Sequence, residues 1–143
     1  MIGTILAKGK VYAAFEHLNR HDLQSLISAW DDKASFVYPG TLRASGTIQG
    51  KKAIEKWFSD FYIQFPKIHF DVQGICVARP FDFIGSNILA AIWEVDLVNK
   101  DGDSTRNCGV TVITIKRGKI VHAQDNIFET GKKFHMMWGE DFK

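Results

Sequence analysis

The second half of this sequence consists largely of long strand-forming runs joined by short turns. Four such runs cover residues 68–77, 87–98, 105–115 and 120–128. Tight turns link the later runs, and their Gly, Asp and Lys residues are typical of hairpins. Long strands that follow one another through short turns pair antiparallel and twist. The pattern therefore predicts a strongly curved antiparallel sheet.

The first half shows helical periodicity instead. Val11, Phe15 and Leu18 recur at helical spacing and predict a helix over about residues 4–19. Asp22 is a typical N-cap residue and predicts a short second helix. The apolar face of this second helix comprises Leu23, Leu26, Ile27 and Trp30.

A third helix is predicted between Gly50 and Pro66. Its bulky apolar face carries Ile54, Trp57, Phe58 and Phe61. A strand at 34–38 and a loop or short strand at 41–49 precede it, and an aromatic tail at 131–143 should pack on the sheet or on a second subunit. Helices first and strands second indicate an α+β fold. Three helices on the concave side of the curved sheet would form a cone that encloses a pocket for a small ligand.

Length and composition limit the class of protein. The chain of 143 residues fits one domain, which we assign to residues 1–143. A hydrophobic fraction of 45% excludes a disordered chain, and a net charge of +2 from scattered basic residues is not typical of nucleic-acid binding. No apolar run approaches the roughly 20 residues of a membrane-spanning helix.

Cysteine and histidine positions bear on compartment and on metal binding. Cys76 and Cys108 fall inside strand-like runs without CxxC spacing, which predicts two buried, reduced thiols and a cytoplasmic protein. The five histidines are dispersed, so we predict no metal site. No nucleotide-binding or nucleophile motif appears, and we predict no cofactor.

Asp125 is the main candidate for chemistry. It lies on the last strand-like run, where alternation places it on one face with Val121, Ala123 and Ile127. A carboxylate on an apolar face is costly unless it is paired, protonated or used. Asp125 is therefore a base that removes a proton next to a carbonyl, a buried hydrogen-bonded anchor, or an exposed surface residue.

Several other residues are candidates for the same pocket. Tyr38 could donate a hydrogen bond to a carbonyl or enolate oxygen of a ligand, or it could be a core tyrosine. Asn107 and Thr111 share strand parity and offer neutral donors, unless they only support strand packing. The apolar walls of the pocket, or else plain core, would be Trp57, Phe58, Phe61 and Trp93.

Three segments resemble the NTF2-like superfamily, and in particular its SnoaL-like polyketide cyclases. They are VYAAFEHLNRHDLQSL at 11–26, IQGKKAIEKWF at 48–58 and GKIV at 118–121. The resemblance implies a cone-shaped α+β barrel with a deep apolar pocket, usually in a homodimer. The ketosteroid isomerases of this superfamily use a Tyr and two Asp residues, and Ala14, Tyr38 and Thr111 stand at those positions here. That mechanism is therefore excluded.

SnoaL-like cyclases use an aspartate in a segment similar to GKIVEHWD, and Asp125 falls on it. Ala123 and Gln124 replace the usual His-Trp pair, and His122 should point away from the pocket. The first hypothesis is a cofactor-independent cyclase, isomerase or dehydratase for a small apolar molecule, in which Tyr38 and Asn107 or Thr111 assist Asp125. The second is a non-catalytic ligand-binding or dimerisation module. The third is a hydrolase acting on water held between Asp125 and a neighbouring amide.

Overall fold

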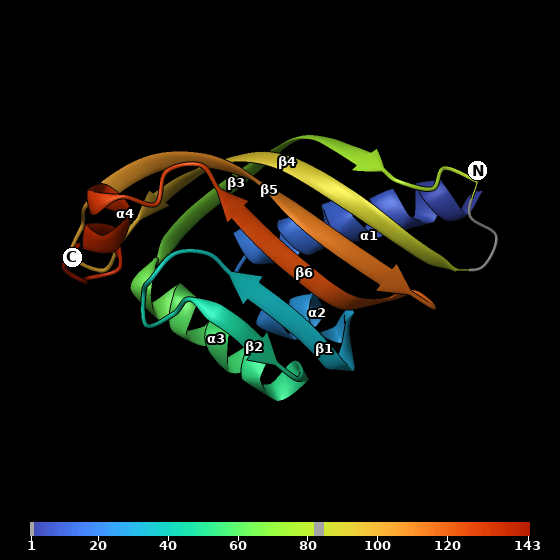
Figure 1. Ribbon diagram of the computed structural model, residues 1–143, viewed down its shortest axis with the longest axis horizontal. Coiled ribbons are helices and arrows are strands. Elements are labelled where there is room, and N and C mark those ends of the chain that lie inside the picture. Colours follow the sequence, from blue (N-terminus) through green and yellow to red (C-terminus); the bar gives the residue numbers. More distant parts are fainter. Residues whose placement is uncertain (1, 82–84) are drawn as a thin grey trace.

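The computed structural model describes residues 2–81 and 85–143 as helices packed on one curved sheet. Six strands form the sheet in the order β2-β1-β6-β5-β4-β3 (Figure 1). Their bounds are β1 Trp30–Tyr38, β2 Gly46–Gln49, β3 Lys67–Val77, β4 Ser86–Val98, β5 Ser104–Lys116 and β6 Lys119–Ile127. The predicted α+β class and the long strands of the second half are thus confirmed.

The sheet is curved, as predicted, and it stays open rather than closing into a barrel. β2 and β3 are the two edges of the sheet, because they pair only with β1 and β4. All neighbouring strands are antiparallel except β1 and β6, which run parallel. The short β2 forms in the segment that the sequence left open as a loop or strand.

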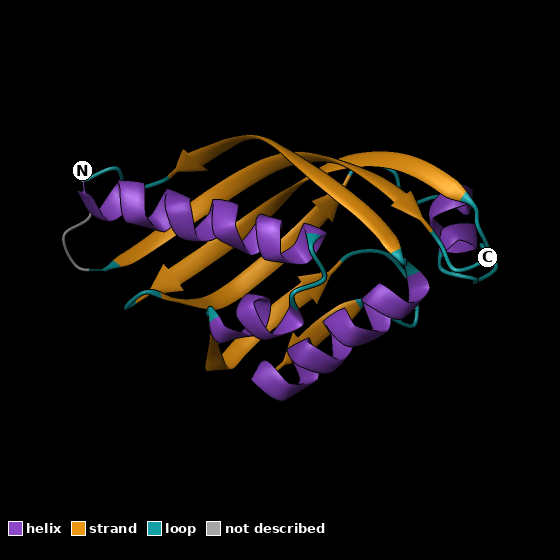
Figure 2. Ribbon diagram, turned by 180° about the vertical axis from the view of Figure 1, so that it is seen from behind, coloured by secondary structure: helices purple, strands orange, loops and turns teal. Residues whose placement is uncertain are grey.

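Within the described residues, four helices rather than three accompany the sheet. They are α1 Ile2–Asn19, α2 Leu23–Ser28, α3 Lys51–Gln64 and α4 Lys132–Met137. Figure 2 shows α1, α2 and α3 along one side of the sheet and α4 at the end near the C-terminus. None of the described helices is long and apolar enough to cross a membrane.

The helices form where the local sequence predicts them. Val11, Phe15 and Leu18 are buried on one face of α1. The Asp22 side chain accepts a hydrogen bond of 3.1 Å from the Ser25 backbone N–H and caps α2. Trp30 is buried as expected, but it begins β1 rather than continuing the α2 face, because the helix ends at Ser28.

A register shift in β6 decides which side chains face the helices. The pairing with β5 jumps from Thr114–His122 to Ile115–Ile120, which leaves Val121 unpaired. Such a bulge reverses the alternation on one side of it. Ile120, and not Val121, therefore shares the inward face with Ala123 and Asp125.

The prediction of two buried thiols is wrong for Cys76. That side chain is exposed, and Cys108 is half-buried. Cys76 pairs with Ala90 at a position where β3 and β4 turn their side chains away from the helices. Strand-like sequence alone does not tell which face a residue occupies.

Candidate functional site

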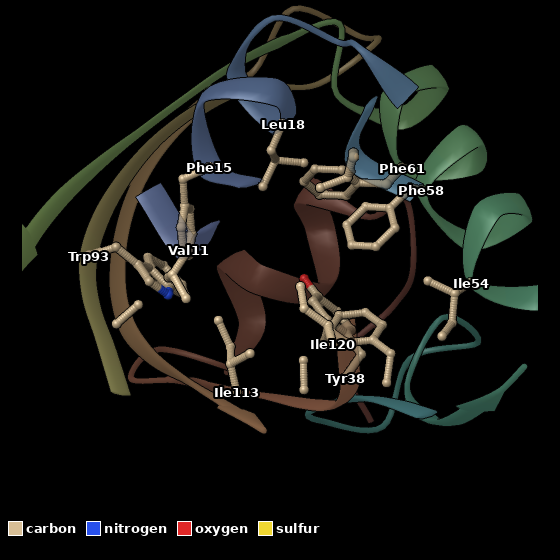
Figure 3. Packing of buried hydrophobic residues seen from close by; sticks show 14 of the residues in the cluster. Val11, Phe15, Leu18, Tyr38, Ile54, Phe58, Phe61, Trp93, Ile113 and Ile120 are labelled. Atoms are coloured by element: carbon tan, nitrogen blue, oxygen red, sulfur yellow. The ribbon is translucent and has the colours of Figure 1, made fainter. Parts of the chain in front are cut away.

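Two adjoining cavities lie between the helices and the sheet. Each has a volume of about 60 Å³, and Leu18, Phe58, Phe70 and Asp125 line both. In Figure 3 the side chains of Leu18, Phe58 and others point inward around an open centre, and the Tyr38 oxygen is directed toward it. We call the cavity that α4 borders the outer cavity, and the other the inner cavity.

The outer cavity contains most of the predicted site. Strand, helix and tail residues meet there, among them Tyr38, Trp57, Phe58, Phe61, Trp93, Asn107 and Asp125. The bulky residues of α3 line the space rather than fill it. Trp57 is held in place because its indole N–H donates to the Ala44 carbonyl at 2.9 Å.

The outer cavity also has lining residues that the sequence analysis did not assign to the site. Phe134, Met137 and Trp138, in and just after α4, lie across its end. Their only signal in the sequence was the aromatic character of the tail. The C-terminal segment of the described chain thus forms part of the cavity wall.

Asp125 is joined to two neighbours by a directed chain of hydrogen bonds. The Thr111 hydroxyl donates to Asp125 Oδ1 at 2.7 Å, and the Trp93 indole N–H donates to the Thr111 oxygen at 2.9 Å. A threonine hydroxyl carries one proton, and the indole nitrogen can only donate. Trp93 therefore fixes the direction in which Thr111 donates. Among the described residues no group donates to the other oxygen, Oδ2.

The surroundings of Asp125 favour its neutral form. Burial raises the pKa of Asp125 from 3.8 to about 6, although the Thr111 hydrogen bond opposes the rise. Its side chain retains some accessible surface, and that surface lines the cavities. At neutral pH the carboxylate is thus ionised but has a basicity well above that of an ordinary aspartate.

Tyr38 is a hydrogen-bond donor rather than a base at this site. Burial raises the pKa of the Tyr38 hydroxyl far above its usual value, the charge of Asp125 raises it further, and a hydrogen bond with Trp138 lowers it in part. The hydroxyl therefore keeps its proton at any physiological pH. Its ring is packed against Trp138 with a centroid distance of 5.5 Å.

Asn107 lines the outer cavity, but its side-chain amide is hydrogen-bonded to backbone groups. Its Nδ2 donates to the Glu129 carbonyl at 2.8 Å, and its Oδ1 accepts from the Cys108 and Glu129 N–H groups. It therefore holds the end of β6. His122 lines neither cavity and contacts the Ser35 hydroxyl at 2.6 Å.

The described part of the chain contains no group of three His, Cys, Asp or Glu side chains that could hold a metal ion. Asp125 and several hydroxyl and indole groups supply polar atoms to the two cavities, and Asn107, Glu129 and Lys133 also line the outer one. These groups transfer or donate protons.

Comparison with known families agrees with this geometry. The model of the SnoaL-like domain family matches residues 11–123. The chain belongs to this family. No curated protein matches the sequence.

Solved structures similar to this SnoaL-like protein have the same fold. A candidate isomerase from Bacillus subtilis has 24% identity over 99% of both chains, with a TM-score of 0.78. An NTF2-like protein from Burkholderia pseudomallei has 14% identity over 89% of this chain and 92% of its own, with a TM-score of 0.71. TerC, co-crystallised with polyporic acid, has 14% identity over 96% and 99%, with a TM-score of 0.72. At these identities the likeness is one of fold.

The pKa of Asp125 predicts a pH-dependent stability difference in this SnoaL-like protein. Because this pKa rises on folding from 3.8 to about 6, the folded state holds an extra proton within that window. The stability contribution of Asp125 should fall as the pH rises through the window and stay constant above it. Asparagine does not ionise, so the Asp125→Asn variant does not lose stability in this way. At about pH 7.5 it should be more stable than the wild type by about 2–3 kcal/mol.

Urea unfolding of both proteins between about pH 4 and pH 8 tests this expectation. The difference in unfolding free energy should shrink toward the acid end, where Asp125 is neutral in both states. A difference that does not change with pH would show that Asp125 titrates normally.

Proposed function

We propose that this SnoaL-like protein binds a small, largely apolar carbonyl compound and that Asp125 moves a proton at the carbon next to the carbonyl. One observation carries the proposal. Asp125 has one oxygen held by Thr111 and one that no described group engages, on the wall of an apolar cavity, with a pKa raised to about 6. This combination is what a general base needs near neutral pH.

The chemistry requires no cofactor. Asp125 Oδ2 takes the proton, the C–H electron pair forms a C=C bond, and the carbonyl π pair moves to oxygen. The Tyr38 hydroxyl donates to the resulting enolate oxygen and stabilises its charge. Return of the proton to another carbon completes an isomerisation. Attack of the enolate carbon on a second carbonyl, whose oxygen takes the proton from Asp125, gives a cyclisation. Loss of a β-hydroxyl group, which leaves as water with that proton, gives a dehydration.

The comparisons support the class of ligand and reaction only in outline. A structural neighbour is described as a candidate isomerase, and another neighbour was crystallised with polyporic acid. The aromatic walls of the outer cavity suit an apolar, ring-containing molecule. The hydrolase hypothesis has less support, because the nearby amide of Asn107 already makes three hydrogen bonds to the backbone of Cys108 and Glu129.

A non-catalytic binding role is the second candidate. The Thr111 hydrogen bond would also suit a buried anchor, for which Asp125 needs no substrate.

The expected homodimer stays a prediction. The outward face of β4 exposes Ile88 and Ile92, each with 42% of its surface accessible, as a dimer contact there would require.

Deuterium exchange tests the proposal without knowledge of the natural substrate. The protein is incubated in D₂O with aryl ketones that have exchangeable C–H groups, such as phenylacetone and 2-tetralone, and exchange is followed by NMR. We expect enzyme-dependent exchange whose rate rises through about pH 6 and then levels off, because the base must be ionised. Ketones that bind but never exchange faster than in buffer would favour the non-catalytic role.

A further inference from the structure

The inner cavity has a different character from the outer one. Its walls are aliphatic and aromatic, and among its described lining residues only Trp30, Thr111 and Asp125 have polar side-chain atoms. Thr111 and Asp125 are already hydrogen-bonded to each other. Asp125 Oδ2 is an open acceptor, and the Trp30 indole N–H is the open donor among these three side chains.

The four indole N–H groups of the chain are not equivalent. Trp57 donates to the Ala44 carbonyl, Trp93 donates to Thr111, and Trp138 is hydrogen-bonded to Tyr38. Trp30 is 4% exposed, and its Nε1 has no partner within the described chain. A buried donor without an acceptor is rare, because it costs about 1–3 kcal/mol relative to a paired one.

Packing holds the Trp30 ring beside the cavity. Its centroid is 6.0 Å from that of Phe36 and 6.3 Å from that of Phe58, and both of these residues also line the inner cavity. Both neighbours are hydrocarbon rings and offer no acceptor. An acceptor oxygen brought in by a ligand would pair the donor.

Trp30 and Asp125 both line the inner cavity, but their backbone positions are well separated along the sheet. Trp30 pairs with Ile120 at the start of β6, and Asp125 lies five residues further along that strand. The two backbone positions are therefore roughly 15 Å apart along the strand, and the Trp30 side chain covers only part of that distance. One carbonyl group cannot contact both residues, so that a ligand would need two separate polar points.

We propose that the Trp30 indole N–H binds a second acceptor oxygen at the far end of the ligand. The ligand class is then an aromatic or cyclic carbonyl compound whose apolar part extends across the two adjoining cavities and whose distal oxygen, in the inner cavity, is an ether, ketone or phenol oxygen. The placement of the first carbonyl beside Asp125 rests on the proposed function. The contact with Trp30 depends only on binding in the inner cavity.

A matched pair of ligands tests this contact. 4-Methoxyphenylacetone and 4-ethylphenylacetone have nearly the same shape, but only the methoxy compound carries the distal oxygen. Their affinities are measured for the wild type and for Trp30→Phe. We expect the preference for the methoxy compound to fall by about three- to tenfold in the variant, as the loss of one hydrogen bond requires. Phenylalanine has a smaller ring than tryptophan, but the resulting loss of packing affects both ligands and cancels in the ratio of their affinities.

A second measurement uses the wild-type protein, so that it does not depend on whether a variant binds the ligand. In ¹⁵N-labelled wild-type protein the methoxy compound should shift the Trp30 indole resonance downfield, whereas the ethyl compound should not. The Trp30→Phe spectrum identifies the resonance by its loss, even if that variant is only partly folded.

The outcomes separate the two proposals. An unchanged affinity ratio together with an unmoved Trp30 resonance overturns the inference, even where Asp125-dependent exchange is observed. Failure of both ligands to bind up to their solubility limit also overturns it. A shifted Trp30 resonance without any exchange confirms the contact and contradicts the catalytic role.

Discussion

Replacement of Asp125 by asparagine is expected to slow deuterium exchange of bound aryl ketones by roughly 100- to 10,000-fold. The amide has nearly the shape of the carboxylate and can still accept the Thr111 hydrogen bond, but it cannot take a proton. Ligand affinity should change little, because the apolar walls of the cavities are untouched. Exchange rates and dissociation constants measured on the same samples check both expectations.

A matched variant controls for the loss of one charge. Asp101→Asn makes the same substitution in the exposed turn between β4 and β5, at a residue that lines neither cavity, and should leave the exchange rate unchanged. If Asp125→Asn retained the wild-type exchange rate, another group would be the base and the proposed function would be wrong. The same variant should be more stable at neutral pH, so that lost activity cannot be attributed to unfolding.

Gly109→Ala is expected to destabilise the fold by about 3 kcal/mol. Gly109 lies on β5 opposite Trp93, and a Cβ there would be 2.3 Å from the Asn126 carbonyl oxygen and 2.9 Å from the Trp93 ring. The carbonyl belongs to the backbone of β6 and cannot rotate away. Either the β5–β6 pairing opens or Trp93 moves away from Thr111. Chemical denaturation measures the loss.

Gly74→Ala is the matched control for this substitution. Gly74 also lies within a strand, β3, but nothing lies within 4 Å of a Cβ added there. The free energy of unfolding of the Gly74→Ala variant should differ from that of the wild type by less than about 1 kcal/mol, because alanine fits a strand at least as well as glycine. Equal losses in the two variants would mean that the close approach at Gly109 is not what constrains that position.

Much of the fold follows from periodicity that is visible in the sequence. The four long strands, the Asp22 cap and the buried stripe of Val11, Phe15 and Leu18 are present as predicted. These features are local, because each depends on spacing within one element. The hydrogen-bond partner of Asp125 could also be predicted, since strand parity placed Thr111 inward.

The features that were missed depend on how elements meet. The bulge at Val121 changes which residues face inward, and it results from pairing between β5 and β6. The contribution of Trp138 to the wall of the outer cavity depends on where the tail docks. The unpaired donor of Trp30 is invisible in the sequence, because only packing shows that no acceptor reaches it.

The hydrogen bond between Thr111 and Asp125 has a stereochemical consequence. Because Oδ1 is occupied by Thr111, proton transfer is left to Oδ2, on one wall of the cavity. A bound substrate then presents the same face to the base for both removal and return of the proton. The transfer is expected to be suprafacial, and a prochiral CH₂ group would lose only one of its two enantiotopic hydrogens.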